Sequence, residues 1–250
     1  MEKITAKSNG QMALGVFART IVAALIGILV YLSLTVIFTS LSTDKIGFAI
    51  YKENEDGSTT FVEKHLYTDE DYTENMELAD DQMVITLYSE VPDGVALTLD
   101  IVSQIASLVV LAAFPYRHLW AQGDHDRNEA SFGHIRVDSL RGLKIGLIAD
   151  IPAILVYAVL WLGKLGVPGL GNTHSLYTLF NSSFLPFCYR TMGRGLTSAT
   201  ALSTGSMLAL FLPVVFLPLV CHVAYTLGLH QFAVTDKLFY KNKKKNRKKR

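Results

Sequence analysis

The chain has only two cysteines, Cys188 and Cys221, and neither belongs to a CxxC pair. So few cysteines in 250 residues predict neither a disulfide framework nor a cysteine-built metal site. Cys221 falls within an apolar run, where a free thiol packs like a small hydrophobic side chain. A packing role is therefore expected for this residue.

The motifs of common enzyme classes are also missing from the sequence. It contains no P-loop, no strand-linked GxGxxG and no GxSxG. Residues 124–128 begin like an EF-hand loop, but Glu129 stands where that loop needs glycine and Ile135 where it needs glutamate. His118, His125 and His134 lack the spacing of a helical zinc motif. We therefore expect no catalytic residue, no cofactor and no metal ligand.

Charge is scarce, because only 18% of the residues are Asp, Glu, Lys or Arg while 50% are hydrophobic. A soluble domain carries about a quarter charged residues. The apolar residues gather in four runs at 19–40, 95–115, 143–163 and 200–227, each near the ~20 residues that cross a bilayer as a helix. The first run exceeds a signal-peptide core of about 7–15 residues. The sequence predicts an α-helical integral membrane protein built as a bundle of four transmembrane helices.

A hydrophilic segment at 41–94 separates the first two spans, and it holds fourteen acidic residues against three lysines. Residues 46–51, 59–67 and 83–88 are rich in β-forming side chains, and Asp56-Gly57 is a turn signal. We predict a small extracytoplasmic β-hairpin domain, with Ile46, Phe48 and Ile50 on one face. Its acidic residues 68–82 are expected to be solvated.

The distribution of basic residues sets the predicted orientation, since Lys and Arg near span ends favour the cytoplasm. The N-terminus at 1–18, the charged loop at 116–142 and the tail at 228–250 are then cytoplasmic. Residues 164–199 lie outside as a re-entrant or interfacial segment, because 176–189 is short and apolar. A five-span alternative would move Arg190 and Arg194 inside but carry the basic tail across. We expect a multi-pass protein of the plasma membrane with both termini cytoplasmic.

Several polar side chains fall within the predicted spans, where such groups face a neighbouring helix or water. Four of them share one face of the second span: Asp100, Ser103, Gln104 and Ser107. Asp150 precedes Pro152, a predicted kink, and His222 lies near the end of the last span. We predict that Asp150 meets His222 and that Asp100 meets Arg194. Alternatively, Asp150 reaches the interface or accepts a hydrogen bond from Ser or Thr.

Small residues at a spacing of four indicate close helix contacts. Gly142 and Gly146 begin the third span, and Ala23 and Gly27 lie in the first. The glycines are expected to allow a close approach between the third and last spans.

The last ten residues hold eight basic side chains and predict an anionic partner. They are Lys241, Lys243, Lys244, Lys245, Arg247, Lys248, Lys249 and Arg250. Anionic lipid headgroups are the favoured partner, and ribosomal RNA is the alternative.

Two functions fit these features. The first is a non-enzymatic subunit or adaptor of a membrane complex, with a membrane-protein partner or a homo-oligomer. The alternative is a small oligomeric transporter or channel subunit, with a polar path near Asp100 and Asp150. The polar groups equally suit the role of holding helices together, which favours the first.

Overall fold

The computed structural model describes residues 8–53, 58–68, 82–193 and 195–232. The chain forms two compact units: residues 33–99 make the first, here called the strand unit, and residues 1–32 with 100–250 make the helical unit. Each is described by itself below. The basic tail that carries the predicted anionic-partner site lies outside the described residues.

The strand unit contains one antiparallel sheet of three strands in the order β2-β1-β3. The strands are β1 (Lys45–Glu53), β2 (Thr59–Leu66) and β3 (Gln82–Tyr88). Ala49 at the centre of β1 pairs with Lys64 on one side and Ile85 on the other. Two predictions are confirmed: β1 pairs with β2, and a third strand pairs with this hairpin. The predicted turn at Asp56-Gly57 lies outside the described residues.

The predicted face of β1 is confirmed in part: pairing is regular from Gly47 to Ile50, so Phe48 and Ile50 lie on one face. Its register shifts between Lys45 and Gly47 and again between Ile50 and Tyr51. Such irregularities disturb the alternation of side chains along a strand. Ile46 lies beside the first of these shifts and is 37% exposed, whereas Phe48 is half-buried and Ile50 is buried, so Ile46 does not share the burial of the other two predicted residues.

In the part of the chain that the structure describes, three helical stretches are long and apolar enough to cross a membrane. They are α1 (Asn9–Ser42), α2 (Asp93–Ser131) and residues 204–229, which hold α7 (Thr204–Ala209) and α8 (Phe211–Leu229). A fourth arises if α3 (Arg141–Ala149) and α4 (Ile151–Lys164) count as one bent span. The structure thus shows three to four apolar stretches of spanning length, the bundle of four spans stays a prediction, and α1 and α2 both extend well beyond the predicted runs.

The junction of α3 and α4 is bent by 57°. Pro152 lies in the first turn of α4, where its missing N–H and fixed φ suit a helix start rather than a helix interior. The kink predicted from this proline is therefore confirmed, and Asp150 is the residue between the two helices.

The segment between α4 and α7 folds into short helices: α5 (Thr173–Phe180), η1 (Ser182–Phe184), α6 (Leu185–Met192) and η2 (Ala199–Ala201). An eight-residue helix such as α5 or α6 is only about 12 Å long. Neither can cross a bilayer of ~30 Å alone. Their predicted re-entrant or interfacial placement stays a prediction.

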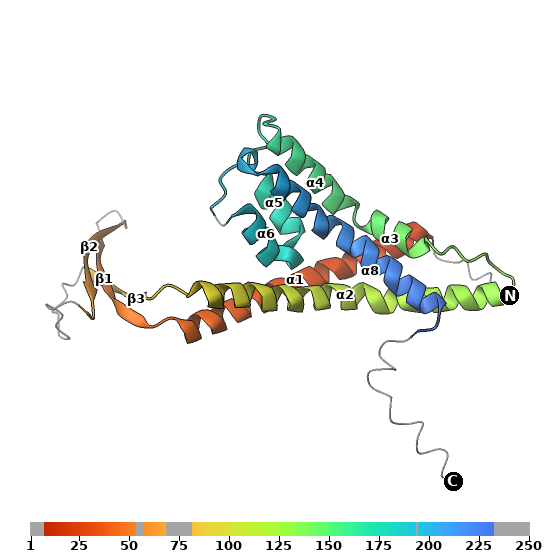
Figure 1. The fold of residues 1–250 in the computed structure, drawn as a ribbon, viewed down its shortest axis with the longest axis horizontal. Helices are drawn as coiled ribbons and strands as arrows, with labels where there is room; N and C mark the ends of the chain where they lie inside the picture. The colour runs from red at the N-terminus through yellow and green to blue at the C-terminus, as the bar shows by residue number, and fades with distance from the viewer. Residues whose placement is uncertain (1–7, 54–57, 69–81, 194, 233–250) are drawn as a thin grey trace, which may run out of the picture. The chain divides into compact units, whose positions relative to one another are not determined.

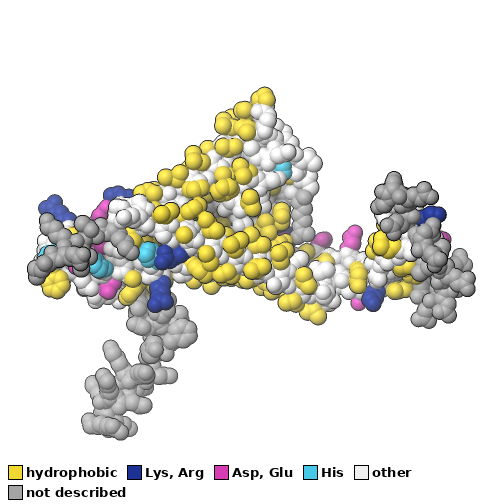
Figure 2. All heavy atoms as spheres, turned by 180° about the vertical axis from the view of Figure 1, so that it is seen from behind, with side chains coloured by type: hydrophobic (Ala, Val, Ile, Leu, Met, Phe, Trp, Pro, Cys, Tyr) yellow, Lys and Arg dark blue, Asp and Glu magenta, His cyan; other side chains and the backbone are white. Residues whose placement is uncertain are grey.

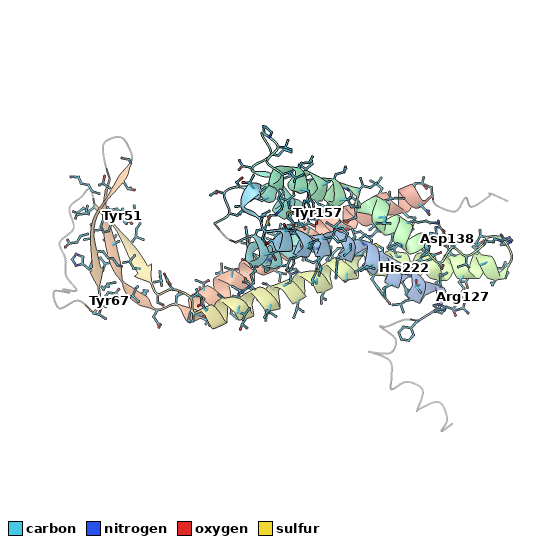
Figure 3. All side chains as sticks on the ribbon, turned by 45° about the horizontal axis from the view of Figure 1, so that its top comes forward. Tyr51, Tyr67, Arg127, Asp138, Tyr157 and His222 are labelled. Carbon is cyan, nitrogen blue, oxygen red and sulfur yellow. The ribbon has the colours of Figure 1, made fainter. Side chains whose placement is uncertain are left out.

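Tyrosines from α4 and α5 hold the α7–α8 junction. The Tyr157 hydroxyl donates to the Met207 carbonyl over 2.8 Å, and the buried Tyr177 hydroxyl donates to the Leu210 carbonyl over 2.5 Å. Such side-chain donors satisfy carbonyl groups at the break between two helices, where lipid offers no hydrogen-bond partner. Figure 3 labels Tyr157 among the surrounding helices.

Helix α8 packs closely against both α2 and α3 (Figure 1). Glycines make this approach possible: a β-carbon on Gly146 would lie 2.7 Å from the Pro218 Cα, and one on Gly142 would lie 2.5 Å from the Tyr225 Cβ. The predicted close contact of Gly142 and Gly146 with the last span is confirmed.

Two apolar clusters form the core of the helical unit. One joins α1, α2, α3 and α8 around Leu119, Ile145 and Tyr225. The other joins α4 and α5 with α6 and α8 around Leu160 and Tyr177. Figure 2 shows hydrophobic side chains covering the middle of the helical unit, while charged groups gather where α2 ends. An apolar surface of this kind suits a lipid environment.

Candidate functional site

The four polar residues of the α2 stripe lie at helix contacts. Asp100 is 5% exposed, and its Oδ2 accepts a hydrogen bond from Arg190 Nε over 2.8 Å. The predicted partner, Arg194, lies outside the described residues, and the observed partner on α6 is one helical turn earlier. The contact of Asp100 with Arg194 therefore stays a prediction, and Arg190 is the partner found within the described residues.

Gln104 and Ser107 extend the same stripe along α2. Gln104 Nε2 donates to the Ser183 carbonyl over 3.1 Å, and its Oε1 accepts from the Phe187 backbone N–H over 3.2 Å. Ser107 Oγ donates to the Gly27 carbonyl of α1 over 3.5 Å. Ser103 Oγ donates to the carbonyl of Asp100 within α2. The stripe thus holds α2 against α1 and the η1–α6 segment.

A second polar cluster was missed by the sequence analysis. Helix α2 continues to Ser131, so the first half of the predicted loop at 116–142 is helical. Asp126 is only 1% exposed rather than solvated. Its Oδ2 accepts from Arg141 Nη1 over 2.5 Å and from the Tyr225 hydroxyl over 2.7 Å. Gln122 Nε2 donates to its Oδ1 over 2.7 Å.

This cluster connects four helices, since Arg141 Nε also donates to Asn9 Oδ1 over 3.1 Å. Residues from α2, α3 and α8 therefore meet at one buried carboxylate, and Arg141 links α1 to it. A signal was present in the sequence: Leu119, Gln122, Gly123 and Asp126 continue the helical spacing of α2 beyond its apolar run. The density of charges around Asp126 outweighed that spacing and favoured a loop.

Asp150 lies at the α3–α4 break and is 7% exposed. Its backbone N–H donates to the Gly146 carbonyl, and its own carbonyl accepts from Ile154. The side chain does not cap α4. Within the described residues, its buried Oδ2 has no hydrogen-bond partner. The predicted alternative, a hydrogen bond from a Ser or Thr to this oxygen, is therefore wrong.

The predicted contact of Asp150 with His222 is wrong. A β-carbon on Gly142 would lie 3.1 Å from the His222 Cα, whereas one on Gly146 would lie beside Pro218. Helices α3 and α8 therefore run antiparallel, so that four residues forward along α3 correspond to four residues back along α8. Continuing this register to Asp150 places it about 12 Å from His222 along the axis of α8. In the described part of the chain, the buried His222 Nδ1 also has no hydrogen-bond partner. Figure 3 places His222 toward the end of the unit that holds Asp138.

Within the described residues, no three His, Cys, Asp or Glu side chains gather as metal ligands would. Comparison with other proteins adds no assignment: no family model matches the chain, and neither a curated protein nor a solved structure is detectably similar to it.

Proposed function

We propose that the chain is a non-enzymatic subunit or adaptor of a membrane complex, inserted in the plasma membrane with both termini cytoplasmic. The observation that carries this proposal is the use made of the α2 stripe. Asp100, Gln104 and Ser107 bind α6, η1 and α1 rather than standing free along a path. Buried polar groups used in this way hold helices in register.

A second feature that supports this proposal is a groove on the surface of the helical unit. An apolar groove of about 560 Å³ lies between α2 and α8. Ala112 and Ala113 line it together with Val109 and Val223. Small residues let a neighbouring helix approach closely in a membrane, so the groove suits a transmembrane helix of a partner or of a second copy.

A photocrosslinker tests this proposal. Val109 in the groove is 63% exposed, and Leu155 on α4 is a matched control at 59%. We expect p-benzoylphenylalanine at position 109 to form one discrete protein adduct in intact membranes. The same polypeptide should co-purify in a fixed ratio from mild detergent. Position 155 should give lipid adducts only. Lipid adducts at both positions, with a monomeric purified chain, would contradict the proposal.

The proposed orientation has its own test. Ser58 and Asn128 are both exposed, so single cysteines there, in a chain without Cys188 and Cys221, are open to reagents. An impermeant maleimide applied to intact cells should label position 58 and spare position 128. Labelling of position 128 would reverse the orientation. A cysteine at Asn246 should also be spared if the apolar stretches make four spans.

The transporter alternative is supported by one observation, the bent α3–α4 span with an acidic residue at its break. Broken helices with polar groups at the break occur at solute sites of transporters. Solute flux into liposomes that contain the pure chain would favour this alternative over the subunit.

A further inference from the structure

An apolar cavity of about 390 Å³ lies between α1 and the α3–α4 break, and among the residues that the structure describes Asp150 is the one ionisable residue that lines it. Phe17, Ile21 and Leu25 of α1 face it, with Phe180 from α5. A volume of this size holds a small organic molecule. The cavity therefore combines an apolar wall with a single acidic group.

The carboxylate of Asp150 lacks a counter-charge within the described residues. Its Oδ2 is buried without a hydrogen-bond partner. The cations of the neighbouring helices bind elsewhere: Arg19 donates to the Gly15 carbonyl, Arg141 binds Asp126 and Lys144 binds Asp138. A buried carboxylate without a partner is strongly unfavourable in an apolar medium. A bound cation would relieve that penalty.

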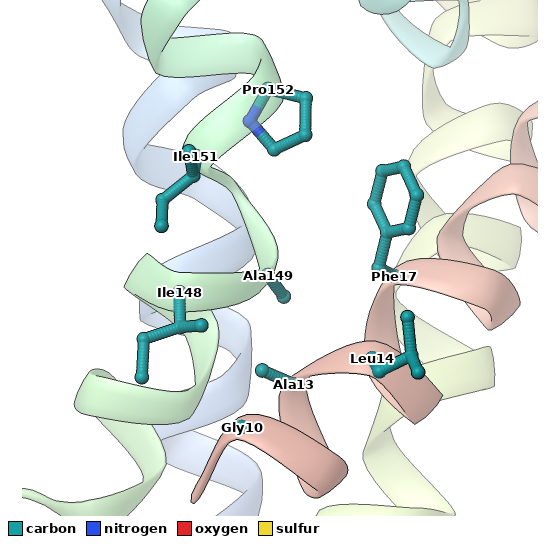
Figure 4. Close-up of a pocket in the computed structure, with 8 residues that line it drawn as sticks. All are labelled: Gly10, Ala13, Leu14, Phe17, Ile148, Ala149, Ile151 and Pro152. Atoms are coloured by element: carbon teal, nitrogen blue, oxygen red, sulfur yellow. The ribbon is translucent and has the colours of Figure 1, made fainter.

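The cavity continues along α1. A second space of about 280 Å³ shares Phe17, Ala149 and Pro152 with the first and extends to Gly10 and Leu14 (Figure 4). Figure 4 shows Phe17 of α1 and Pro152 of α4 on opposite sides of this space. Their lining residues together run along α1 from Gly10 to Ile28, about 27 Å at 1.5 Å per residue, so the apolar wall beside the acidic group is long enough for an aliphatic chain.

We propose that the α1/α3–α4 cavity binds an organic ammonium ion that carries an aliphatic chain. The positive head lies at Asp150, and the aromatic rings of Phe17 and Phe180 line the same space, where aromatic faces attract cations. The chain follows the second space toward Leu14. This inference does not rest on the proposed function, since binding requires neither a partner subunit nor transport.

The lining disfavours other ligand classes. Calcium takes six to eight oxygen ligands, and magnesium takes six. Asp150 supplies the only carboxylate among the lining residues, and the hydroxyl of Thr20 already donates to the Val16 carbonyl. An anion would meet a carboxylate without screening. An organic monocation needs one acidic group and an apolar wall, which is what the cavity provides.

Three probes with the same ten-carbon chain test the charge preference: decyltrimethylammonium, decan-1-ol and decanesulfonate. Native mass spectrometry of the full chain released from detergent micelles counts the molecules bound. We expect one decyltrimethylammonium to bind per chain. The alcohol and the sulfonate should bind at least about tenfold more weakly, because neither makes the ionic contact with Asp150. Equal binding of the three probes would overturn the proposal.

Variants locate the site. Asp150→Asn should weaken decyltrimethylammonium binding about tenfold. Ala24→Phe fills the cavity with Asp150 intact and should also weaken binding, whereas Leu29→Phe on the same helix, outside the lining residues, should not. Unchanged binding in both Asp150→Asn and Ala24→Phe would show that the probe binds elsewhere and would overturn the assignment.

A measurement on the unmodified chain covers the case in which a variant does not fold. Dicyclohexylcarbodiimide adds to buried carboxyl groups: the carboxyl proton moves to nitrogen, the oxygen bonds to the central carbon, and rearrangement leaves an N-acylurea with no group lost. We expect peptide mass spectrometry to find this product at Asp150. Decyltrimethylammonium should slow its formation about tenfold, because the bound cation covers Asp150 and holds it as the carboxylate, which lacks the proton that the reaction uses, and decanesulfonate should not. Equal rates with both probes would contradict the site.

Discussion

Replacing Asp126 by alanine is expected to destabilise the helical unit by about 3–5 kcal/mol, because it leaves the guanidinium of Arg141 buried without its charged partner. The Arg141 side chain is only 13% exposed and the Asp126 side chain 2%. The same change removes the acceptor of the Tyr225 hydroxyl and of Gln122. Unfolding in mixed micelles with increasing dodecyl sulfate, followed by the fluorescence of Trp120 and Trp161, measures the loss.

The chain offers a matched control in the ion pair of Asp138 and Lys144. Its atoms are 2.7 Å apart, close to the buried pair, but the two side chains are 43% and 53% exposed. The hydrogen bond from Lys144 lowers the pKa of Asp138, so this pair is ionised in neutral buffer. Asp138→Ala should still cost less than about 1 kcal/mol, because water screens exposed pairs. Equal losses from the two substitutions would show that Asp126 is not buried as described.

The double variant Asp126→Leu with Arg141→Met separates charge from packing. Replacing both members of a buried ion pair by apolar residues is often neutral. We therefore expect it to recover most of the stability lost in Asp126→Ala. Failure to recover would assign the loss to Tyr225 and Asn9, which would then lack their partners.

The sequence predicted the apolar stretches because lipid-length runs leave a strong pattern. It also predicted the kink at Pro152 and the contact through Gly142 and Gly146, because proline and glycine act through local geometry. Which polar side chains contact each other across different helices could not be predicted in this way. They depend on helix register and on where helices end: Arg190 pairs with Asp100 because it lies on α6, a short helix that the sequence analysis did not predict.

The error at Asp126 has the same origin. Seven of the eighteen residues at 124–141 are charged, and this composition favours a loop. Helix α2 nevertheless continues to Ser131, because Leu119 and Tyr225 bury that face of the helix. Tertiary contacts overrode local composition, as they commonly override propensity. For Asp150 the sequence identified a buried acid correctly but gave no information on the cavity, which is formed by α1, a helix more than 100 residues away in sequence.

The second large effect is expected at the crossing of α2 and α8, where Gly228→Ala should cost about 2–3 kcal/mol. A β-carbon on Gly228 would lie 2.1 Å from the Trp120 carbonyl oxygen, and one on Gly123 would lie 2.2 Å from the Tyr225 carbonyl oxygen. Both obstacles are backbone atoms, so no side-chain rotation relieves the overlap and the helices must separate. The same dodecyl sulfate titration measures the loss.

Gly10→Ala is the control for this experiment, because the nearest atom to its added β-carbon is the Ser8 Oγ at 4.0 Å. Alanine favours a helix over glycine, so no loss of stability is expected there. The double variant Gly123→Ala with Gly228→Ala should lose less than the sum of the single losses, because either methyl group alone already forces the two helices apart. Strictly additive losses would mean that the two glycines do not share one crossing, and the close packing of α2 on α8 would have to be abandoned.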